Sequence, residues 1–365
     1  MTRISQEPVR ALAIGIITLA AYGSSAPAVA GFMQTNLVSD IPDLAAFTDP
    51  NLKNPWGIAK SATSPFWVSN QVSGNATLYN SAGQPQALVV TVPATGGPTG
   101  QVFNPTSDFA LTTGGKALFL FANLNGSISG WNPAQGTLAQ VVGSTSGAVY
   151  TGLALGKAGT QNFLYAADAA GNKIDVFNGS FAPTSLAGSF ADPTLPAGFT
   201  VYNIQEVGGV LLVTYENEVS GGGVVNAFDA NGNFLRRVSA NAEGGPLDSP
   251  WGVTLAPSTF GPFGGTLLVG NEDDGHISAF DFTTGAFLGQ LLDTNGNPIA
   301  NTGLWGLTFG NGGNGGDPSK LYFAAGINDG ANGLFGSIAA VVPEPNVLAL
   351  LGIGLAGLGF ARRKH

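Results

Sequence analysis

The sequence predicts an all-β protein made of a repeated unit, and two observations support this. The first is composition: the 365 residues include 55 Gly and 22 Pro, while only 10% of the residues are charged, so turn formers outnumber the charged residues that favour helices. The second is a pattern that occurs six times, in which a Gly and a short β-type run precede an aromatic residue, usually followed by a turn-capping Asn or Asp. The six aromatic residues lie 46 to 55 positions apart and are Tyr79, Trp131, Phe177, Phe228, Phe280 and Phe335.

Each unit contains four short strand-like segments, which is the signature of a β-propeller blade. One apolar run precedes each Gly, and another follows the turn after each aromatic residue. A further segment opens each unit and is expected to form the innermost strand; these segments are residues 56–59, 108–111, 151–155, 202–207, 251–255 and 305–309. At about 51 residues per unit, residues 31–341 hold six blades, so the sequence predicts a six-bladed β-propeller.

The ring of blades must close. The sixth unit stops after residues 337–340, and a spare strand-like segment, residues 34–39, precedes the first unit. We expect one end of the body to complete the blade of the other, because closure removes sheet edges that invite aggregation. A pair of β-sandwiches or a β-solenoid are the alternatives, although solenoid repeats are usually shorter and a sandwich has no reason to repeat six times.

Residues 1–30 have the three parts of a secretory signal peptide. Arg3 and Arg10 supply the positive start, residues 11–21 form the apolar core, and Ala28 and Ala30 mark the predicted cleavage site. The alternative is an N-terminal membrane anchor, for which an apolar run of this length is too short.

Residues 342–365 form a second targeting segment. A Pro-Glu-Pro sequence precedes the apolar residues 347–361, which as a helix would reach roughly 22 Å, short of the ~30 Å hydrocarbon core. A basic end follows and should stay cytoplasmic. The sequence therefore predicts a short C-terminal transmembrane helix, with an ordinary tail anchor as the alternative. The residues assigned to the signal are Pro343, Glu344, Pro345, Arg362, Arg363 and Lys364.

This tail resembles the PEP-CTERM sorting signal of Gram-negative exported proteins, with all three parts in order over about the last 24 residues. The resemblance implies an exosortase-type membrane enzyme as a partner and transient insertion in the inner membrane. It also implies cleavage near the Pro-Glu-Pro, a final location at the cell surface or outside the cell, and a link to exopolysaccharide or biofilm matrix. Whether the tail is cleaved or retained stays open.

The body carries a second resemblance. The phrases in residues 49–58, 195–205, 250–252, 285–298, 303–307 and 333–338 are similar to those of an uncharacterised family of exported bacterial propeller-like proteins, many with a PEP-CTERM tail. More loosely, the blade pattern resembles NHL-repeat and gluconolactonase-like six-bladed propellers. The resemblance implies the fold and export, and it transfers no catalytic residue.

Residue counts exclude several kinds of chemistry. The chain has no Cys and two His, which removes disulfides, thiolate sites and every two-histidine metal motif. Residues 31–341 keep eight of the 13 basic residues and 20 of the 22 acidic ones, a net charge of −12. Such a surface repels polyanions, so we expect no nucleic-acid partner.

Asp, Glu and Asn are then the plausible ligands. Gluconolactonase-like propellers hold a metal in the central channel with such residues, so the resemblance makes a divalent cation conceivable, but no motif assigns one and no cofactor is predicted. Trp56, Trp251 and Trp305 share one position in their units, and we expect them to pack between blades rather than stack on sugars. The candidate channel residues are Asn54, Asp108, Asn203, Glu206, Asp248, Asn271 and Asp273.

The sequence contains no catalytic constellation. It favours an exported, non-enzymatic binding or matrix-associated propeller. A metal-dependent lactonase-like hydrolase that uses channel carboxylates is the alternative, and a purely structural surface protein is a third.

Overall fold

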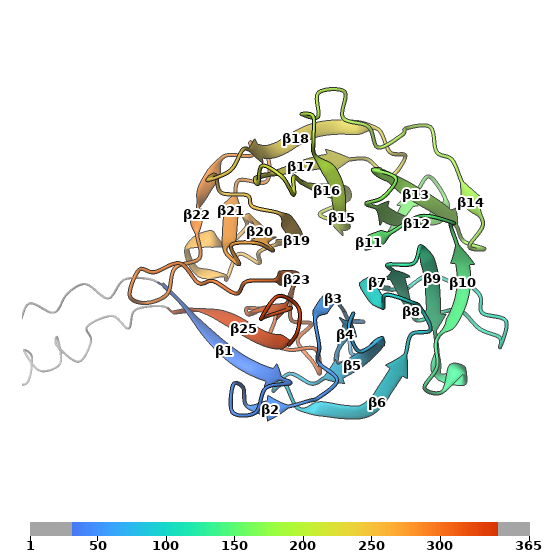
Figure 1. The fold of residues 1–365 in the computed structure, drawn as a ribbon, viewed down its shortest axis with the longest axis horizontal. Helices are drawn as coiled ribbons and strands as arrows, with labels where there is room; N and C mark the ends of the chain where they lie inside the picture. Colours follow the sequence, from blue (N-terminus) through green and yellow to red (C-terminus); the bar gives the residue numbers. More distant parts are fainter. Residues whose placement is uncertain (1–30, 342–365) are drawn as a thin grey trace, which may run out of the picture.

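The computed structural model describes residues 31–341, which fold into six sheets arranged around a central axis (Figure 1). Five sheets have four strands and the sixth has five. The helical elements in this part of the chain are two 3₁₀ turns, η1 (Pro133–Gln135) and η2 (Gly261–Phe263). The predicted all-β, six-bladed propeller is confirmed.

Within each blade the chain runs from the centre outward, except in the last blade, where the first strand of the body takes the outer place. The inner strands are β3 (Pro55–Ala59), β7 (Pro98–Phe103), β11 (Tyr150–Ala158), β15 (Thr200–Val207), β19 (Pro250–Leu255) and β23 (Leu304–Phe309). The second strands are β4 (Phe66–Asn70), β8 (Phe119–Asn123), β12 (Gln161–Asp168), β16 (Val210–Glu216), β20 (Leu267–Asn271) and β24 (Leu321–Ala325). The third strands are β5 (Asn75–Tyr79), β9 (Ser127–Trp131), β13 (Lys173–Asn178), β17 (Gly223–Phe228), β21 (Ile277–Phe280) and β25 (Leu334–Val341). The outer strands are β6 (Pro85–Thr91), β10 (Gln140–Ser144), β14 (Pro183–Thr184), β18 (Phe234–Asn241), β22 (Phe287–Gln290) and β1 (Gly31–Ser39).

The ring closes as predicted. Strand β1 pairs antiparallel with β25, from Gly31 opposite Val341 to Ser39 opposite Leu334. The short strand β2 (Phe47–Thr48) adds parallel to β1 and makes this the five-stranded sheet. The two ends of the described chain therefore lie side by side at the rim, and the last blade hydrogen-bonds the first and last parts of the body together (Figure 1).

The inner strand of the second blade differs from the prediction. Residues 108–111 contribute only an isolated bridge between Ala110 and Lys116, and the inner strand is β7, ten residues earlier. Thr99 and Gly100 take the place that Trp and Gly occupy in the first, fifth and sixth blades. The pair lacks Trp, as Thr151-Gly152 of the third blade does, and in the second blade residues 108–111 offer a second candidate segment between β7 and β8.

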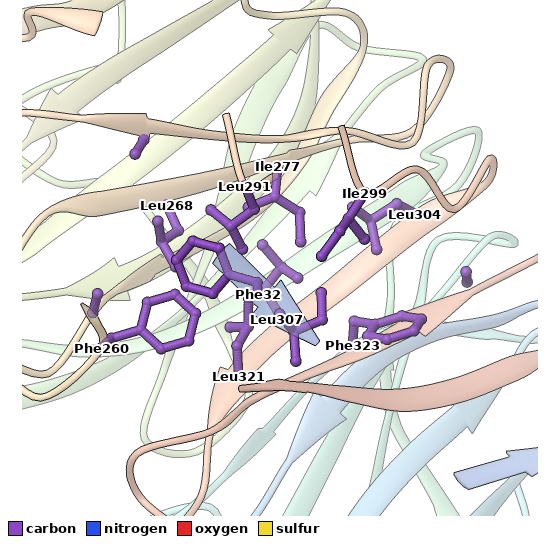
Figure 2. Packing of buried hydrophobic residues seen from close by; sticks show 14 of the residues in the cluster. Phe32, Phe260, Leu268, Ile277, Leu291, Ile299, Leu304, Leu307, Leu321 and Phe323 are labelled. Atoms are coloured by element: carbon purple, nitrogen blue, oxygen red, sulfur yellow. The ribbon is translucent and has the colours of Figure 1, made fainter. Parts of the chain in front are cut away.

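The core lies between neighbouring blades. Figure 2 shows the contact of the fifth and sixth blades, where side chains from both sheets interdigitate. Phe32 of β1 enters this contact and packs against Phe260, with ring centroids 5.0 Å apart. Burying such a ring stabilises the fold by about 1.5–3 kcal/mol, so closure of the ring also completes this core. The six repeated aromatic residues of the sequence pattern are all buried in these contacts.

Both predicted targeting segments lie outside the described residues. They include the cleavage residues Ala28 and Ala30, the residues of the sorting signal and the predicted C-terminal helix. Among residues 31–341, the structure has no helix that is long and apolar enough to span a membrane.

Candidate functional site

The inner strands of the six blades surround the central axis (Figure 1), and residues from their starts and from their ends gather in two different places. We call the end where these strands begin the amino mouth, and the end where they finish the carboxyl mouth. Side chains near the N-terminal ends of the inner strands form one aromatic cluster. Residues near the C-terminal ends of these strands line one large cavity. The two mouths therefore offer different chemistry.

Four aromatic side chains close the channel near the amino mouth. Trp56, Tyr202, Trp251 and Trp305, here called the aromatic plug, form one buried cluster. The rings of Trp56 and Trp305 are stacked, with centroids 3.6 Å apart, and Trp251 meets Trp305 edge-on at 5.9 Å. The three tryptophans are buried, as predicted, but they pack on one another across the axis instead of only between adjacent blades.

Asn203 is a structural link beneath the plug. It is almost fully buried, and its Nδ2 donates to the backbone oxygen of Trp251 at 2.7 Å, which ties the fourth blade to the fifth. Its Oδ1 lies so near Gly152 that a Cβ there would be 2.1 Å away, so this approach requires glycine. These contacts commit the Asn203 amide to blade packing.

The amino mouth gathers carboxylates. Glu216 ends β16 and Glu272 follows β20, at matching places in neighbouring blades. Burial first, and then repulsion from Glu218, Glu272 and Asp273, raises the pKa of Glu216 to about 8. Burial and the nearby Asp273 raise the pKa of Glu272 to about 7. Buried carboxylates that repel one another hold protons more tightly than carboxylates in water.

Four of the sequence candidates also lie at the amino mouth and mostly tie loops together. Nδ2 of Asn54 donates to Oε1 of Gln71 at 2.8 Å. Nδ2 of Asn271 donates to the backbone oxygen of Pro246 at 3.2 Å. Oδ2 of Asp273 accepts from the Ser249 hydroxyl at 2.7 Å.

Asp248, the fourth of these candidates, accepts a longer hydrogen bond, 3.4 Å, from the backbone N–H of Gly222. Burial raises its pKa, and repulsion from Asp273 adds to the effect. Asp248 thus belongs to the same crowded group of carboxylates as Glu216 and Glu272.

The seven candidates do not form one ligand set. Asp108 and Glu206 belong to the carboxyl side, the other candidate carboxylates lie at the amino mouth, and the aromatic plug and Asn203 stand between. Within residues 31–341, no group of three or more His, Cys, Asp or Glu side chains is placed to hold a metal ion. The channel metal implied by the looser resemblance therefore does not fit these residues.

The carboxyl mouth is an open cavity of about 510 Å³. Apolar side chains such as Phe103 and Leu155 form much of its wall, and five blades contribute to it. Ligand sites in proteins commonly combine such apolar walls with a few placed polar groups. The polar side chains of the cavity are Lys60, Gln101, Gln205, Glu206 and Thr308.

Two of these polar groups, half-buried Lys60 and buried Gln101, have unmet hydrogen-bonding capacity. Lys60 follows β3, and its Nζ donates to the Thr308 hydroxyl at 2.7 Å. Burial lowers the pKa of Lys60 to about 8. Gln101 is only 6% exposed; its Nε2 donates to the backbone oxygens of Gly57 and Trp67, while its Oε1 has no partner in the described part of the chain.

The cavity continues outward as a trough. A second cavity of about 380 Å³ shares Pro105, Leu155 and Glu206 with the first and adds Lys157 and Asn162. A third, of about 290 Å³, shares Asn162 with the second and reaches Asp108. The Nδ2 of Asn162 donates to Oδ2 of Asp108 at 2.8 Å. We call these three adjoining cavities the carboxyl-face trough; it brings together Asp108 and Glu206, two of the predicted candidates.

Sequence reasoning missed Lys60, Gln101 and Gln205, although Gln101 had a detectable signal. Gln101 lies two positions after Thr99, and at the corresponding position the other five inner strands have an apolar residue. The apolar residues at that place are Ile58, Leu153, Ile204, Val253 and Leu307. The sequence prediction placed the inner strand of the second blade at residues 108–111, so Gln101 was not compared with the residues at this position.

A model of the PEP-CTERM protein-sorting motif matches residues 341–364. The match confirms the resemblance predicted for the tail. It indicates an exported protein with C-terminal membrane anchoring before processing, and it implies processing by an exosortase.

Solved structures with this fold share little sequence with the chain. A structural-genomics protein of Bacteroides thetaiotaomicron has a TM-score of 0.54 at 12% identity, covering 86% of this chain and 77% of that one. Streptogramin B lyase has a TM-score of 0.51 at 14% identity, covering 86% and 98%. A PQQ-bound aldose sugar dehydrogenase of Streptomyces coelicolor has a TM-score of 0.53 at 13% identity, covering 86% and 99%. These likenesses show the propeller fold.

Two viral proteins match most of the chain in sequence. Uncharacterized protein L690 of Acanthamoeba polyphaga mimivirus is 30% identical over 341 residues, covering 85% of this chain and 86% of that protein. Uncharacterized protein R648 of the same virus is 32% identical over 330 residues, covering 83% of this chain and 78% of that protein. With this identity over most of both chains, the protein belongs to the propeller family that includes R648.

Proposed function

We propose that the protein is a non-enzymatic, matrix-associated binding protein that holds a polysaccharide segment in the carboxyl-face trough. The trough itself carries the proposal: three adjoining cavities extend from the axis toward the outer part of the third blade. An elongated site of this kind suits a chain of linked units better than a single small molecule. The sorting motif supports the location, because it indicates a protein that works outside the cell.

The lining also suits sugars. Amide and hydroxyl side chains both donate and accept hydrogen bonds, as sugar hydroxyls do, and the trough carries Gln101, Gln205, Thr308 and Asn162. Phe103, Pro105 and Leu155 offer apolar walls for the C–H faces of sugar rings. Exopolysaccharide is therefore the proposed partner.

A matched pair of substitutions tests the site. Leu155 and Leu255 hold equivalent positions near the carboxyl ends of β11 and β19, but only Leu155 lines the trough. We expect Leu155→Trp to reduce retention of the full chain on immobilised matrix polysaccharide by about ten-fold, because the larger ring fills the junction of two cavities. Leu255→Trp serves as the control and should bind like the parent. No retention of the parent on any matrix polymer would contradict the proposal.

A lactonase-like hydrolase that uses channel carboxylates is the second candidate. The raised pKa values of Glu216 and Glu272 favour its acid–base chemistry, while no ligand set for its metal is found among the described carboxylates. Carboxyl groups with pKa values near neutrality are common among general acids and bases. Elemental analysis of the purified protein and a panel of lactones test this candidate. Protein that is folded, metal-free and inactive on the panel, even after divalent cations are added, would exclude it.

A further inference from the structure

Among residues 31–341, Lys60 is the one cation that lines the axial cavity. Its amine donates a hydrogen bond to a neutral hydroxyl, and it has no carboxylate partner in this part of the chain. Four other cations of the body also lack a carboxylate partner: Lys116, Lys157, Arg236 and Lys320. Lys60 differs from them in its place, at the axial end of the trough.

The position of Lys60 explains why the missing partner matters. Its amine is half-buried at the axial end of the trough, where water screens a charge less well than in bulk solvent. An ammonium group has three donors, and the Thr308 hydroxyl takes one of them. An anion bound in the cavity would supply the negative charge that Lys60 lacks, and it would accept hydrogen bonds from the other two N–H groups of the amine.

Gln101 supplies an independent indication of a ligand. Its Oε1 is a buried acceptor without a donor in the described part of the chain, and it lines the same cavity as Lys60. Native proteins usually satisfy buried polar groups, and of the twelve such unpartnered atoms in the described part of the chain, Gln101 Oε1 belongs to the residue that lines this cavity. A hydroxyl group on the ligand would satisfy it. A ligand that carries both an anionic group and a hydroxyl would therefore satisfy both Lys60 and Gln101.

We propose that the axial end of the trough binds the carboxylate of an acidic sugar unit, such as a uronate, within the polysaccharide. Lys60 Nζ binds the carboxylate, and Gln101 Oε1 accepts a hydrogen bond from a neighbouring hydroxyl of the same sugar. This inference rests on the proposed function and names its substrate class. Phe103 and Leu155 flank the sugar ring. Lys60 brings the positive charge to this cavity, and Glu206, which lines the same cavity, is its carboxylate.

Because the net charge of −12 repels polyanions, the test uses a single acidic unit. Two oligosaccharides of equal length are titrated into the full chain in detergent by calorimetry: an acidic hexamer with one glucuronate among glucose units, and a neutral hexamer of glucose. At pH 7 we expect the acidic hexamer to bind at least about ten-fold more tightly than the neutral one. Lys60→Met should remove this preference and leave the affinity for the neutral hexamer within about two-fold. Lys60→Arg should restore most of the preference, and Lys320→Met, outside the trough, should leave it unchanged.

The pH profile adds a readout that altered packing would not give. Preference for the acidic hexamer should fall above about pH 8, as Lys60 loses its proton, and this fall should be absent in Lys60→Met. Equal affinity for both hexamers, or an acidic preference that survives in Lys60→Met, would overturn the inference and leave the proposed function standing. Failure of both hexamers and of matrix polysaccharide to bind would overturn both.

Discussion

At the amino mouth Glu216 and Glu272 are carboxylates without a paired cation in the described part of the chain, whereas at the carboxyl mouth Lys60 is a half-buried cation without a paired carboxylate. The same six inner strands build both ends. The strand interiors supply the aromatic plug and the contacts between blades, which fix the fold. At the strand ends the amino mouth gathers carboxylates, whereas the carboxyl mouth combines Lys60 with the single carboxylate of Glu206.

The comparison also shows what each mouth is able to bind. The plug closes the axis at the amino end, and Glu216 and Glu218 line a separate cavity of about 430 Å³ beside it. The carboxyl end keeps an open cavity of about 510 Å³ on the axis that continues as a trough. Its length and the presence of Lys60 thus favour the carboxyl mouth for a polymer that carries an acidic unit.

Truncating the aromatic plug should have the largest effect on stability, because the plug rings are buried and pack on one another. Trp305 is 5% exposed and contacts the other three rings of the plug. We expect Trp305→Ala to lower the free energy of unfolding by about 3–5 kcal/mol, as for other buried aromatic residues. Guanidinium unfolding measures this loss. Phe287→Ala, at a 48% exposed ring, is the control and should cost far less; an equal cost for both would show that the plug is not part of the core.

The acidic mouth should give a smaller effect that depends on pH. The pKa of Glu216 rises from 4.5 to about 8 in the folded protein, so the unfolded state ionises first as pH increases. Stability therefore falls between about pH 5 and pH 8. Glu216→Gln removes the buried charge and should add about 1–3 kcal/mol at pH 8, with little gain at pH 5.

Glu218→Gln is the matched control for this prediction, because Glu218 is exposed at the same mouth. Denaturant unfolding at both pH values should show little change for this variant. If Glu216→Gln stabilised the protein equally at pH 5 and pH 8, the effect would come from packing and not from charge.

The sequence predicted the fold better than the site. Aromatic residues at regular spacing mark the third strand of each blade, so the number of blades and the closure of the ring were visible without a structure. The inner strand of the second blade was misplaced because it lacks the Trp found in three other blades and a second candidate segment, residues 108–111, lies between it and β8. Asp108 entered the list of channel residues through that error, and it lies at the outer end of the trough.

The position of each residue along its strand explains why the seven candidate channel residues do not meet at one site. Asn54 lies just before β3, whereas Glu206 lies near the end of β15. A five-residue strand is roughly 17 Å long, so residues beside the same strands can face opposite ends of a channel. Proximity to an inner strand in sequence therefore does not place a residue at a particular mouth. Lys60 and Gln101 become a pair only once the blades are folded.

The carboxyl mouth should respond to pH in the opposite sense, with the smallest effect. The pKa of Lys60 falls from 10.5 to about 8 on folding, so below pH 10.5 the unfolded state takes up the proton first. Lys60 therefore lowers stability most below about pH 8, and the penalty fades as pH rises. Lys60→Met should add about 1 kcal/mol at pH 7 and less at pH 9.5, because it removes a poorly solvated charge. Comparing unfolding of this variant with Lys320→Met at both pH values cancels the titration of other groups. If the stability gain of Lys60→Met grew with pH, Lys60 would not be a poorly solvated cation. The stability effects of the two mouths would then not depend on pH in opposite directions.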